Sequence, residues 1–351
     1  MTVRRVVVFL PNWIGDAVMA TPTLRALRDH YGPGTEIVGV MRPHVDALLR
    51  GSGLVDRTWL HVPEWRDFDH RPRGLVRRLL REGADVSVHL TNDLLSACVA
   101  RLGRVPIRAG YARNRRGRLL THPLEAPRDG TSFLPIPALD YYLAIAAALG
   151  CTPGSRRLEL ATVAADEAAA DAAWRALGLA TGEPVLLLNS SGAYGAAKLW
   201  PEEHFAALAR RIATDLDHAV VVLCGPAERS RAASIATRAA HPRVASLAMQ
   251  PLGIGLTKAC VRRSRGLVST DSGPRHVGAA FGVPVVAIFG PTDPAWSETR
   301  HPGEVQVRRE VPCGPCGERS CPVVHHACMR DLGVEDVFAA VSRAIAPGTP
   351  P

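Results

Sequence analysis

The chain has 351 residues, of which 47% are hydrophobic and 21% are charged, and it carries a net charge of +9. These proportions are typical of a folded protein and exclude a disordered chain, while the length suits two domains better than one. No apolar run approaches the roughly 18 residues of a membrane span, and Met1 to Arg5 lead into a strand without the apolar stretch of a signal peptide, so we expect a cytoplasmic protein.

The positive charge is concentrated in one part of the chain. Between Arg71 and Arg118 there are 12 Arg against 3 acidic residues. Such a segment suits an anionic partner, namely nucleic acid, a phospholipid headgroup layer or an acidic glycolipid, although an Arg-rich composition also places Arg on ordinary solvated faces. Only Lys198 and Lys258 are lysines among the 42 strong bases, so each is a candidate for a site that needs a compact ammonium group.

The first half alternates short apolar strands with helices, as in a doubly wound parallel sheet. Strands are predicted at 6–10, 36–40, 57–60, 85–89 and 107–109, and helices at 17–28, 44–50, 75–81 and 140–149. The loop at 11–16, between the first strand and the first helix, is a candidate ligand-binding edge without the dinucleotide G-x-G-x-x-G motif. Residues 110–118 are predicted to form an exposed basic loop, and the alternative is a disordered segment that is only solvated.

The second half repeats this alternation. Strands are predicted at 185–189, 219–224, 244–247, 266–269 and 284–289, and helices at 201–214, 225–240, 256–261, 274–281 and 334–345. A helix predicted at 166–177 comes before these elements and belongs to the first domain. Residues 181–184 are a reasonable boundary, which divides the chain into domains at 1–180 and 181–351.

A polar turn at Asp271-Ser272-Gly273 lies between a predicted strand and a predicted helix. In an open α/β sheet, ligands bind at the carboxyl ends of the strands, and a helix N-terminus suits a phosphate. The alternative is that Asp271 or Ser272 only caps the helix.

Four motifs in order along the chain carry a more specific signal: residues 12–16 (NWIGD), 197–205 (AKLWPEEHF), 270–276 (TDSGPRH) and 289–294 (FGPTDP). Together they resemble the ADP-heptose:lipopolysaccharide heptosyltransferases of glycosyltransferase family 9, most closely the heptosyltransferase II branch, from residue 6 to about residue 345. The resemblance implies an α/β GT-B fold of two Rossmann-like domains facing a central cleft, with the acceptor bound by the first domain and ADP-heptose by the second. It also implies inverting transfer of L-glycero-D-manno-heptose, with no cofactor required for catalysis.

The resemblance assigns roles to individual residues. Asp16 matches the family's catalytic carboxylate, which takes the proton of the attacking hydroxyl, although Asp is also a favoured helix cap. On the donor side Lys198 matches the phosphate-binding lysine, Asp271 falls where the heptose hydroxyls bind, and Glu228 fits the acidic position for the ribose. The remaining expected donor contacts are Ser191, Gly192, Ser272, Gly273 and His276, of which His276 is alternatively a packed histidine.

The acceptor site is less closely matched. Heptosyltransferase II relatives tend to have Thr-Asn-Ser-Phe-(Arg/Lys)-Ser after the fourth strand, where residues 91–96 read TNDLLS here. A basic residue is thus replaced by Leu95, and Asp93 is added. We expect Asn92, Arg113 and Arg115 to bind the acceptor.

Cys313, Cys316, Cys321 and Cys328 lie within sixteen residues, together with His325 and His326. Four thiolates at this spacing could close a tetrahedral structural Zn or Fe site, and a His could replace one sulfur; the alternative is a reduced loop without metal. Some heptosyltransferase relatives that modify proteins carry a Cys-bound metal near the C-terminus. The other cysteines are expected to pack as small hydrophobic residues.

We therefore expect a heptosyltransferase of the lipopolysaccharide inner core that acts on Kdo-lipid A or heptosyl-Kdo-lipid A at the cytoplasmic face of the inner membrane, as a peripheral protein. The basic first domain would meet the anionic glycolipid and the membrane surface, and no nucleic-acid partner is expected. The alternatives are a protein or secondary-metabolite sugar as acceptor, a GT-B nucleotide-sugar epimerase, and a basic zinc-knuckle protein that binds nucleic acid.

Overall fold

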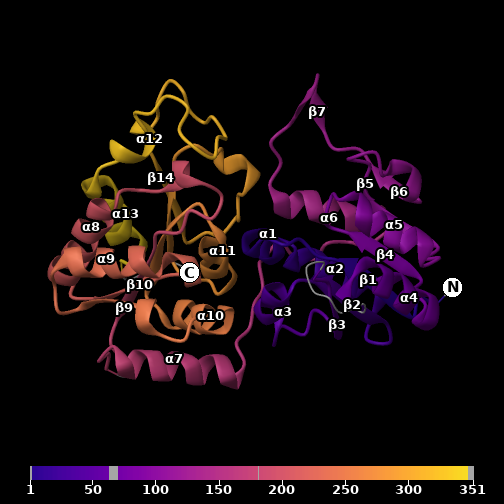
Figure 1. Ribbon diagram of the computed structural model, residues 1–351, viewed down its shortest axis with the longest axis horizontal. Coiled ribbons are helices and arrows are strands. Elements are labelled where there is room, and N and C mark those ends of the chain that lie inside the picture. Colours follow the sequence, from indigo (N-terminus) through magenta and orange to yellow (C-terminus); the bar gives the residue numbers. More distant parts are fainter. Residues whose placement is uncertain (1, 63–69, 181, 347–351) are drawn as a thin grey trace. The chain divides into compact units, whose positions relative to one another are not determined.

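The computed structural model describes residues 2–62, 70–180 and 182–346, which form two compact α/β units (Figure 1). The first unit comprises residues 1–160 and 295–299, and the second comprises residues 161–294 and 300–351. The division after Leu160 lies earlier than the boundary expected at 180, and Thr181 is outside the described residues. The reason is that helix α7 (Ala164–Ala176) packs on helix α10 (Ile254–Arg263). At this contact the buried Lys258 ammonium donates to the Ala161 carbonyl at 2.8 Å and pairs with Asp166. Lys258 is therefore a structural lysine.

The first unit is built on a parallel six-stranded sheet in the order β3-β2-β1-β4-β5-β6. Its strands are β1 (Arg5–Phe9), β2 (Glu36–Met41), β3 (Arg57–Leu60), β4 (Val86–His89), β5 (Ile107–Tyr111) and β6 (His122–Leu124). A short antiparallel hairpin, β7 (Arg128–Asp129) and β8 (Ser132–Phe133), follows β6. Its helices are α1 (Ile14–Met19), α2 (Thr21–Tyr31), α3 (Pro43–Leu49), α4 (Pro72–Glu82), α5 (Leu94–Leu102) and α6 (Ala138–Ala148).

Two helices stand where one was predicted at 17–28. The residue whose N–H would bond to the Val18 carbonyl is Pro22, which has no N–H, and the Thr21 hydroxyl donates to that carbonyl at 2.7 Å instead. Helix α1 therefore ends at Met19, and α2 begins at Thr21 with its proline in the first turn.

The second unit has a parallel six-stranded sheet in the order β11-β10-β9-β12-β13-β14. Its strands are β9 (Val185–Asn189), β10 (Ala219–Leu223), β11 (Val244–Ser246), β12 (Gly266–Thr270), β13 (Val285–Phe289) and β14 (Glu304–Arg308). Its helices are α7 (Ala164–Ala176), α8 (Glu202–Asp215), α9 (Arg229–Ala239), α10 (Ile254–Arg263), α11 (Gly273–Ala280), α12 (Ala327–Arg330) and α13 (Val334–Ala344). Strands β9, β10, β12 and β13 are buried along their whole length, as their continuous apolar sequences predict.

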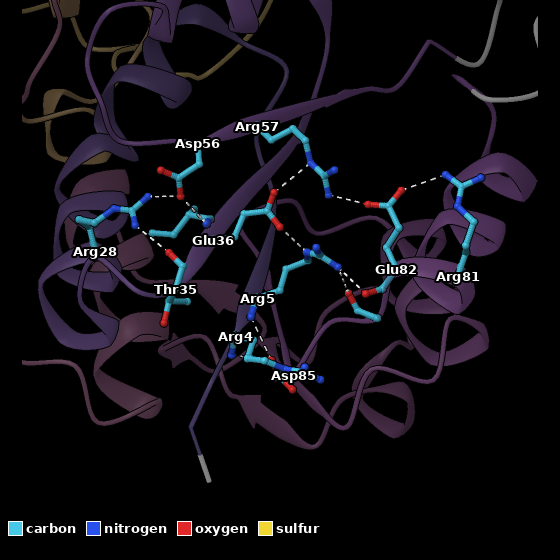
Figure 2. A network of polar contacts seen from close by, with 12 residues as sticks. Arg4, Arg5, Arg28, Thr35, Glu36, Asp56, Arg57, Arg81, Glu82 and Asp85 are labelled. Carbon is cyan, nitrogen blue, oxygen red and sulfur yellow. Dashed lines mark hydrogen bonds and ion pairs between the residues drawn. The ribbon is translucent and has the colours of Figure 1, made fainter.

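A polar network joins the amino ends of the strands in the first unit (Figure 2). Arg5 at the start of β1 pairs with Glu36 at the start of β2, and Arg57 at the start of β3 bonds to both Glu36 and Glu82. Asp85 lies just before β4, and its carboxylate accepts from the backbone N–H of Arg5. These charges hold the amino edge of the sheet together, which leaves the carboxyl edge for ligands.

Among the described residues, no helix combines the length and the apolar character needed to cross a membrane.

Candidate active site

The predicted donor turn lies at the point where the strand order of the second sheet reverses. The chain runs from β9 outward to β11 and then returns to β12, so the loops after β9 and β12 leave the sheet side by side. The Asn189 amide joins them, donating to Ser269 Oγ at 2.9 Å and Ser272 Oγ at 2.8 Å. In open α/β sheets this switch point is where ligands bind.

Lys198 and Asp271 meet at this switch point. The Lys198 ammonium donates to a carboxylate oxygen of Asp271 at 2.6 Å and to its backbone carbonyl at 2.9 Å, and it stands 4.8 Å from the ring centroid of Tyr194. The short 3-10 turn Ala196–Lys198 delivers the lysine from the loop after β9. Lys198 thus holds its charge beside the α11 N-terminus, as a phosphate site requires.

Neighbouring side chains hold the Asp271 carboxylate in place. Besides Lys198, the Thr292 hydroxyl donates to it at 2.8 Å and Arg275 at 3.1 Å. Burial opposes ionisation, but the charges of Lys198 and Arg275 outweigh it and lower the pKa of Asp271 to about 2. From the sequence, Asp271 was expected only to bind the heptose hydroxyls. The contacts show that its oxygens also orient Lys198.

Arg275 is fully buried and was not predicted as a site residue. Its guanidinium makes a two-point contact with Glu304 at 2.7 and 3.0 Å and lies 4.8 Å from the Phe289 ring centroid. Burial opposes ionisation of Glu304, and the Arg275 charge nevertheless lowers its pKa. Arg275 therefore anchors the Asp271 turn to β14.

The turn at Asp271-Ser272-Gly273 is not explained by helix capping. Ser272 is the N-cap residue of α11, but its side chain makes no capping hydrogen bond, and Gly273 begins the helix. His276 is 3% exposed, and burial together with the Arg275 charge lowers its pKa to about 3, so the ring is neutral and packed. Ser272 and Gly273 thus remain candidate donor contacts, while the burial of His276 favours the packed alternative.

Two neighbouring loops complete the donor side. The Ser191 carbonyl accepts from the Thr270 hydroxyl at 2.5 Å, and a Cβ at Gly192 would lie 2.4 Å from Leu199, so the chain turns tightly there. The Glu228 carboxylate, after β10, accepts from the Gly225 N–H at 2.9 Å through one oxygen. Glu228 is therefore fixed at the carboxyl edge beside β9, the position that the ribose assignment needs.

A cavity of about 300 Å³ opens next to the donor turn, lined by Gly290, Thr292, Arg308 and Arg309 among others. Sequence reasoning missed Thr292 and these arginines as site residues, although Thr292 stands in the fourth motif. Glu310 lines the same cavity and pairs with Arg308 at 3.0 Å, so the lining carries both charges.

In the first unit, Asp16 and Asn92 follow the two strands that flank the switch point, β1 and β4. The N-cap of α1 is Trp13, and Asp16 is the third helical residue, so Asp16 is not the cap. The buried Tyr142 hydroxyl of α6 hydrogen bonds to the Asp16 carboxylate, and burial followed by the Asp16 charge raises the pKa of Tyr142 well above its usual value. Tyr142 therefore orients the predicted catalytic carboxylate.

The prediction of an exposed basic loop at 110–118 is wrong for part of its length. Arg116 is fully buried, and it donates to the Tyr111 carbonyl at 2.8 Å and to the Asn92 side-chain oxygen at 3.2 Å. Tyr111 is also buried, whereas Arg115 is exposed and Arg113 stacks on Phe133 at 3.9 Å. The run of basic residues at 110–118 did not indicate in the sequence which arginine would be buried against backbone carbonyls.

Asp93, the departure from the family pattern, is the N-cap of α5. Its carboxylate accepts from the Ser96 N–H at 2.7 Å, and hydrogen bonds from Thr91 and Ser96 lower its pKa despite burial. Asp93 thus has a structural role that Ser would also fill.

A cavity of about 480 Å³ lies at the carboxyl edge of the first sheet, lined by Asn12, Arg42, His61, Asn92, Asp93 and Asn114 among others. A larger hollow of about 830 Å³ in the second unit is lined by Pro184, His218 and Arg265. These three residues precede β9, β10 and β12, at the amino edge of the sheet, so we assign the substrate to the carboxyl edges.

The four clustered cysteines line one small cavity of about 20 Å³ together with His325 and His326. Burial, and then the charges of Cys313, Cys316 and Cys321, raise the pKa of Cys328 to about 11. Among the described residues, no three His, Cys, Asp or Glu side chains are arranged as a metal-binding group. The thiols lie near one another, and the expected metal site stays a prediction.

The model of glycosyltransferase family 9 (heptosyltransferase) matches residues 73–326, more than half of the chain. The chain belongs to this family. It is therefore a glycosyltransferase of the heptosyltransferase family, as the four motifs implied. The family also accounts for two Rossmann-like units whose switch points carry Asp16 and Lys198.

Individual relatives agree with the family. The Campylobacter jejuni lipooligosaccharide heptosyltransferase 2 is 23% identical over 98% of this chain and all of its own length. E. coli ADP-heptose lps heptosyltransferase II superposes with a TM-score of 0.78 at 21% identity, covering 97% of this chain and 98% of the other. E. coli heptosyltransferase WaaC with ADP-2-deoxy-2-fluoro heptose superposes with a TM-score of 0.69 at 19% identity, covering 97% and 99%. The GT-B fold of this chain is thereby confirmed.

Proposed function

We propose that this enzyme transfers L-glycero-D-manno-heptose from ADP-heptose to the lipopolysaccharide inner core, with Kdo-lipid A or heptosyl-Kdo-lipid A as the acceptor. The observation that carries the proposal is the Lys198–Asp271 pair at the switch point of the second sheet, in a chain of the heptosyltransferase family. Support for the donor comes from the E. coli relative that was crystallised with a fluorinated ADP-heptose.

The reaction is one displacement. An acceptor hydroxyl oxygen attacks the anomeric carbon, its proton passes to the Asp16 carboxylate, and the bond from that carbon to the diphosphate oxygen breaks, so that ADP leaves. The departing diphosphate gains negative charge, which Lys198 and the α11 N-terminus stabilise more in the transition state than in the ground state. A single carboxylate base suffices for inversion, whereas retention by double displacement would need a second as nucleophile.

The first unit supports an anionic sugar as acceptor. The cavity of about 480 Å³ carries Arg42 and His61 among amide side chains, and a Kdo carboxylate is the kind of group that an Arg binds with two hydrogen bonds. Asn92 and the exposed Arg115 remain our proposed acceptor contacts, and Arg113 is held near them by Phe133. A protein or another sugar is the alternative acceptor.

A donor and acceptor screen tests the proposal. We expect ADP-heptose to raise the melting temperature more than UDP- or GDP-sugars do, and ADP release to require Kdo-lipid A or its heptosylated form. Mass spectrometry of the acceptor should show one added heptose. Donor consumption without acceptor would instead indicate an epimerase, and transfer only to protein would contradict the glycolipid assignment.

We also propose that Cys313, Cys316, Cys321 and Cys328 hold a structural Zn or Fe ion. The four thiols line one cavity, and a divalent cation would offset the repulsion between thiolates. The same segment is bonded to the Lys198 turn, since His326 Nε2 lies 2.7 Å from the Ala197 carbonyl and Tyr194 donates to Gly317 at 2.6 Å. A metal would therefore steady the donor loop without taking part in catalysis.

Elemental analysis after anaerobic purification tests the metal proposal. We expect about one Zn or Fe per chain, and its loss in Cys316→Ser/Cys321→Ser together with a lower melting temperature. Cys98→Ser, in the other unit, is the matched control and should keep the metal. A metal-free chain in which all four thiols react readily with a thiol reagent would refute the proposal.

A further inference from the structure

We propose that the outer surface of α4 and α5 docks the first unit onto an anionic lipid bilayer. This docking face comprises Arg73, Arg77, Leu80 and Arg81 of α4, Leu94, Leu95, Arg101 and Leu102 of α5, and Arg104 just after α5. The bilayer is the source of the anionic phosphates, and the inference rests on the proposed function only in expecting a lipid-linked acceptor.

Packing places the two outer surfaces side by side. The inner sides of both helices, with Leu75, Leu79, Val99 and Ala100, belong to one core cluster with β1, β2 and β3. The two helices touch where a Cβ at Gly103 would lie only 2.6 Å from Leu79. Since both helices cover the same face of the sheet, their opposite sides point away from it together.

The docking face is unusually apolar for a solvated surface. Leu80 is 52% exposed and Leu102 is 63% exposed, beside the contact between Leu79 and Gly103. Leu94 and Leu95 are also exposed, and the spacing of 94, 95, 101 and 102 puts them on one side of α5 with Arg101. Leucines interleaved with arginines are typical of helices that lie in a membrane interface.

Four of the five arginines of this face, Arg73, Arg77, Arg101 and Arg104, form no ion pair with the described residues, whereas Arg81 pairs with Glu82. The nearby acids are already engaged. Glu82 is bound by Arg57 and Arg81, and Asp85 accepts from the backbone N–H groups of Arg4 and Arg5 (Figure 2). Asp93 caps α5. The four unpaired arginines are thus available to lipid phosphates. Each arginine near an anionic surface strengthens membrane binding by about fivefold.

The exposed leucines favour a bilayer over nucleic acid. A phosphate backbone offers nothing to an exposed Leu side chain, whereas proteins that bind single strands use aromatic stacking. One end of the face also reaches the candidate acceptor cavity, because Leu95 at the start of α5 lines it. A bilayer on this face would therefore hold a lipid-linked sugar next to the cavity.

Vesicle flotation of the full chain tests the inference without any acceptor or donor. We expect binding to vesicles of 30% phosphatidylglycerol in phosphatidylcholine, weak binding to pure phosphatidylcholine, and release by high salt. Leu80→Gln/Leu102→Gln/Arg77→Glu/Arg101→Glu should weaken binding to the anionic vesicles by at least about 25-fold, since two cations are reversed. The control Met249→Gln/Arg238→Glu, which replaces one exposed Met and reverses one exposed Arg in the second unit, should bind like the unchanged protein.

The readouts separate this inference from the proposed function. With a soluble, delipidated Kdo acceptor, the docking-face variant should turn over at the unchanged rate, while its rate on vesicle-embedded acceptor should fall. Equal vesicle binding by the variant, or binding of the unchanged protein to a short RNA and not to the anionic vesicles, would overturn the docking face. Absence of turnover on both acceptors, with vesicle binding intact, would overturn the proposed function alone.

Discussion

Replacing Asp16 with Asn is expected to lower the rate constant of heptose transfer by about 10² to 10⁴, while the dissociation constant of ADP-heptose changes by less than about twofold. The amide keeps the size and polarity of the side chain but cannot accept the proton of the attacking hydroxyl. Because Trp13 and not Asp16 caps α1, little stability should be lost. Single-turnover transfer and calorimetric titration with ADP-heptose measure the two quantities separately.

Two further variants show whether a loss of transfer in Asp16→Asn is specific to Asp16. Asp29→Asn removes an exposed carboxylate from α2 in the same unit and should leave transfer unchanged. Tyr142→Phe removes the hydroxyl that hydrogen bonds to Asp16 and should lower transfer by about tenfold, again with unchanged donor affinity. If Asp16→Asn transfers heptose at the normal rate, the base is another residue and Asp16 serves only the dipole of α1.

The sequence predicts most of both sheets because their strands are continuous apolar runs that are buried on both faces. The runs at 185–189 and 219–224 correspond to β9 and β10 almost residue for residue. Strand β14 was missed, because it lies at the sheet edge and is only partly buried. Helix α5 was missed for a related reason, since its exposed leucines blur the periodicity that identifies a helix.

The candidate site could be predicted where a motif marks the end of a strand. Asp271 directly follows β12, Asp16 and Lys198 lie in the segments that follow β1 and β9, and the structure brings Lys198 and Asp271 into direct contact. Some partners of these residues could not be predicted. Tyr142 and Glu304 act through contacts over long sequence separations, which neither composition nor spacing reveals. Arg275 follows Asp271 by four residues, a spacing at which side chains meet on a helix, and this signal in the third motif was overlooked.

Buried arginines show most clearly what could not be predicted from the sequence. Arg116 and Arg275 are both fully buried, yet neither differs in sequence from the many exposed arginines around it. What distinguishes them is a set of carbonyl or carboxylate acceptors assembled by the fold. A charge count therefore overestimates the basic surface, and only the structure shows which arginines remain available to a ligand.

Replacing Arg275 with Met is expected to lower the free energy of unfolding by about 3 to 5 kcal/mol, because it leaves Asp271 and Glu304 buried without the cation that both share. For a domain of this size the melting temperature should fall by about 6 to 20 °C. ADP-heptose should bind more weakly as well, since Asp271 orients Lys198. Arg238→Met, an exposed arginine of α9, is the matched control and should change neither quantity.

The pH dependence of the free energy of unfolding tests why Arg275→Met is less stable. In the unchanged protein the lowered pKa values of Asp271 and Glu304 contribute stability above about pH 4, which is lost as the pH falls towards 2. In Arg275→Met burial dominates and raises the Glu304 pKa above its unfolded value, so protonation relieves the buried charge. The stability difference between the two proteins should therefore narrow from pH 7 to pH 5, and Arg275→Met/Glu304→Met should recover part of the loss at pH 7. A difference that is constant with pH would instead attribute the loss to packing against Phe289.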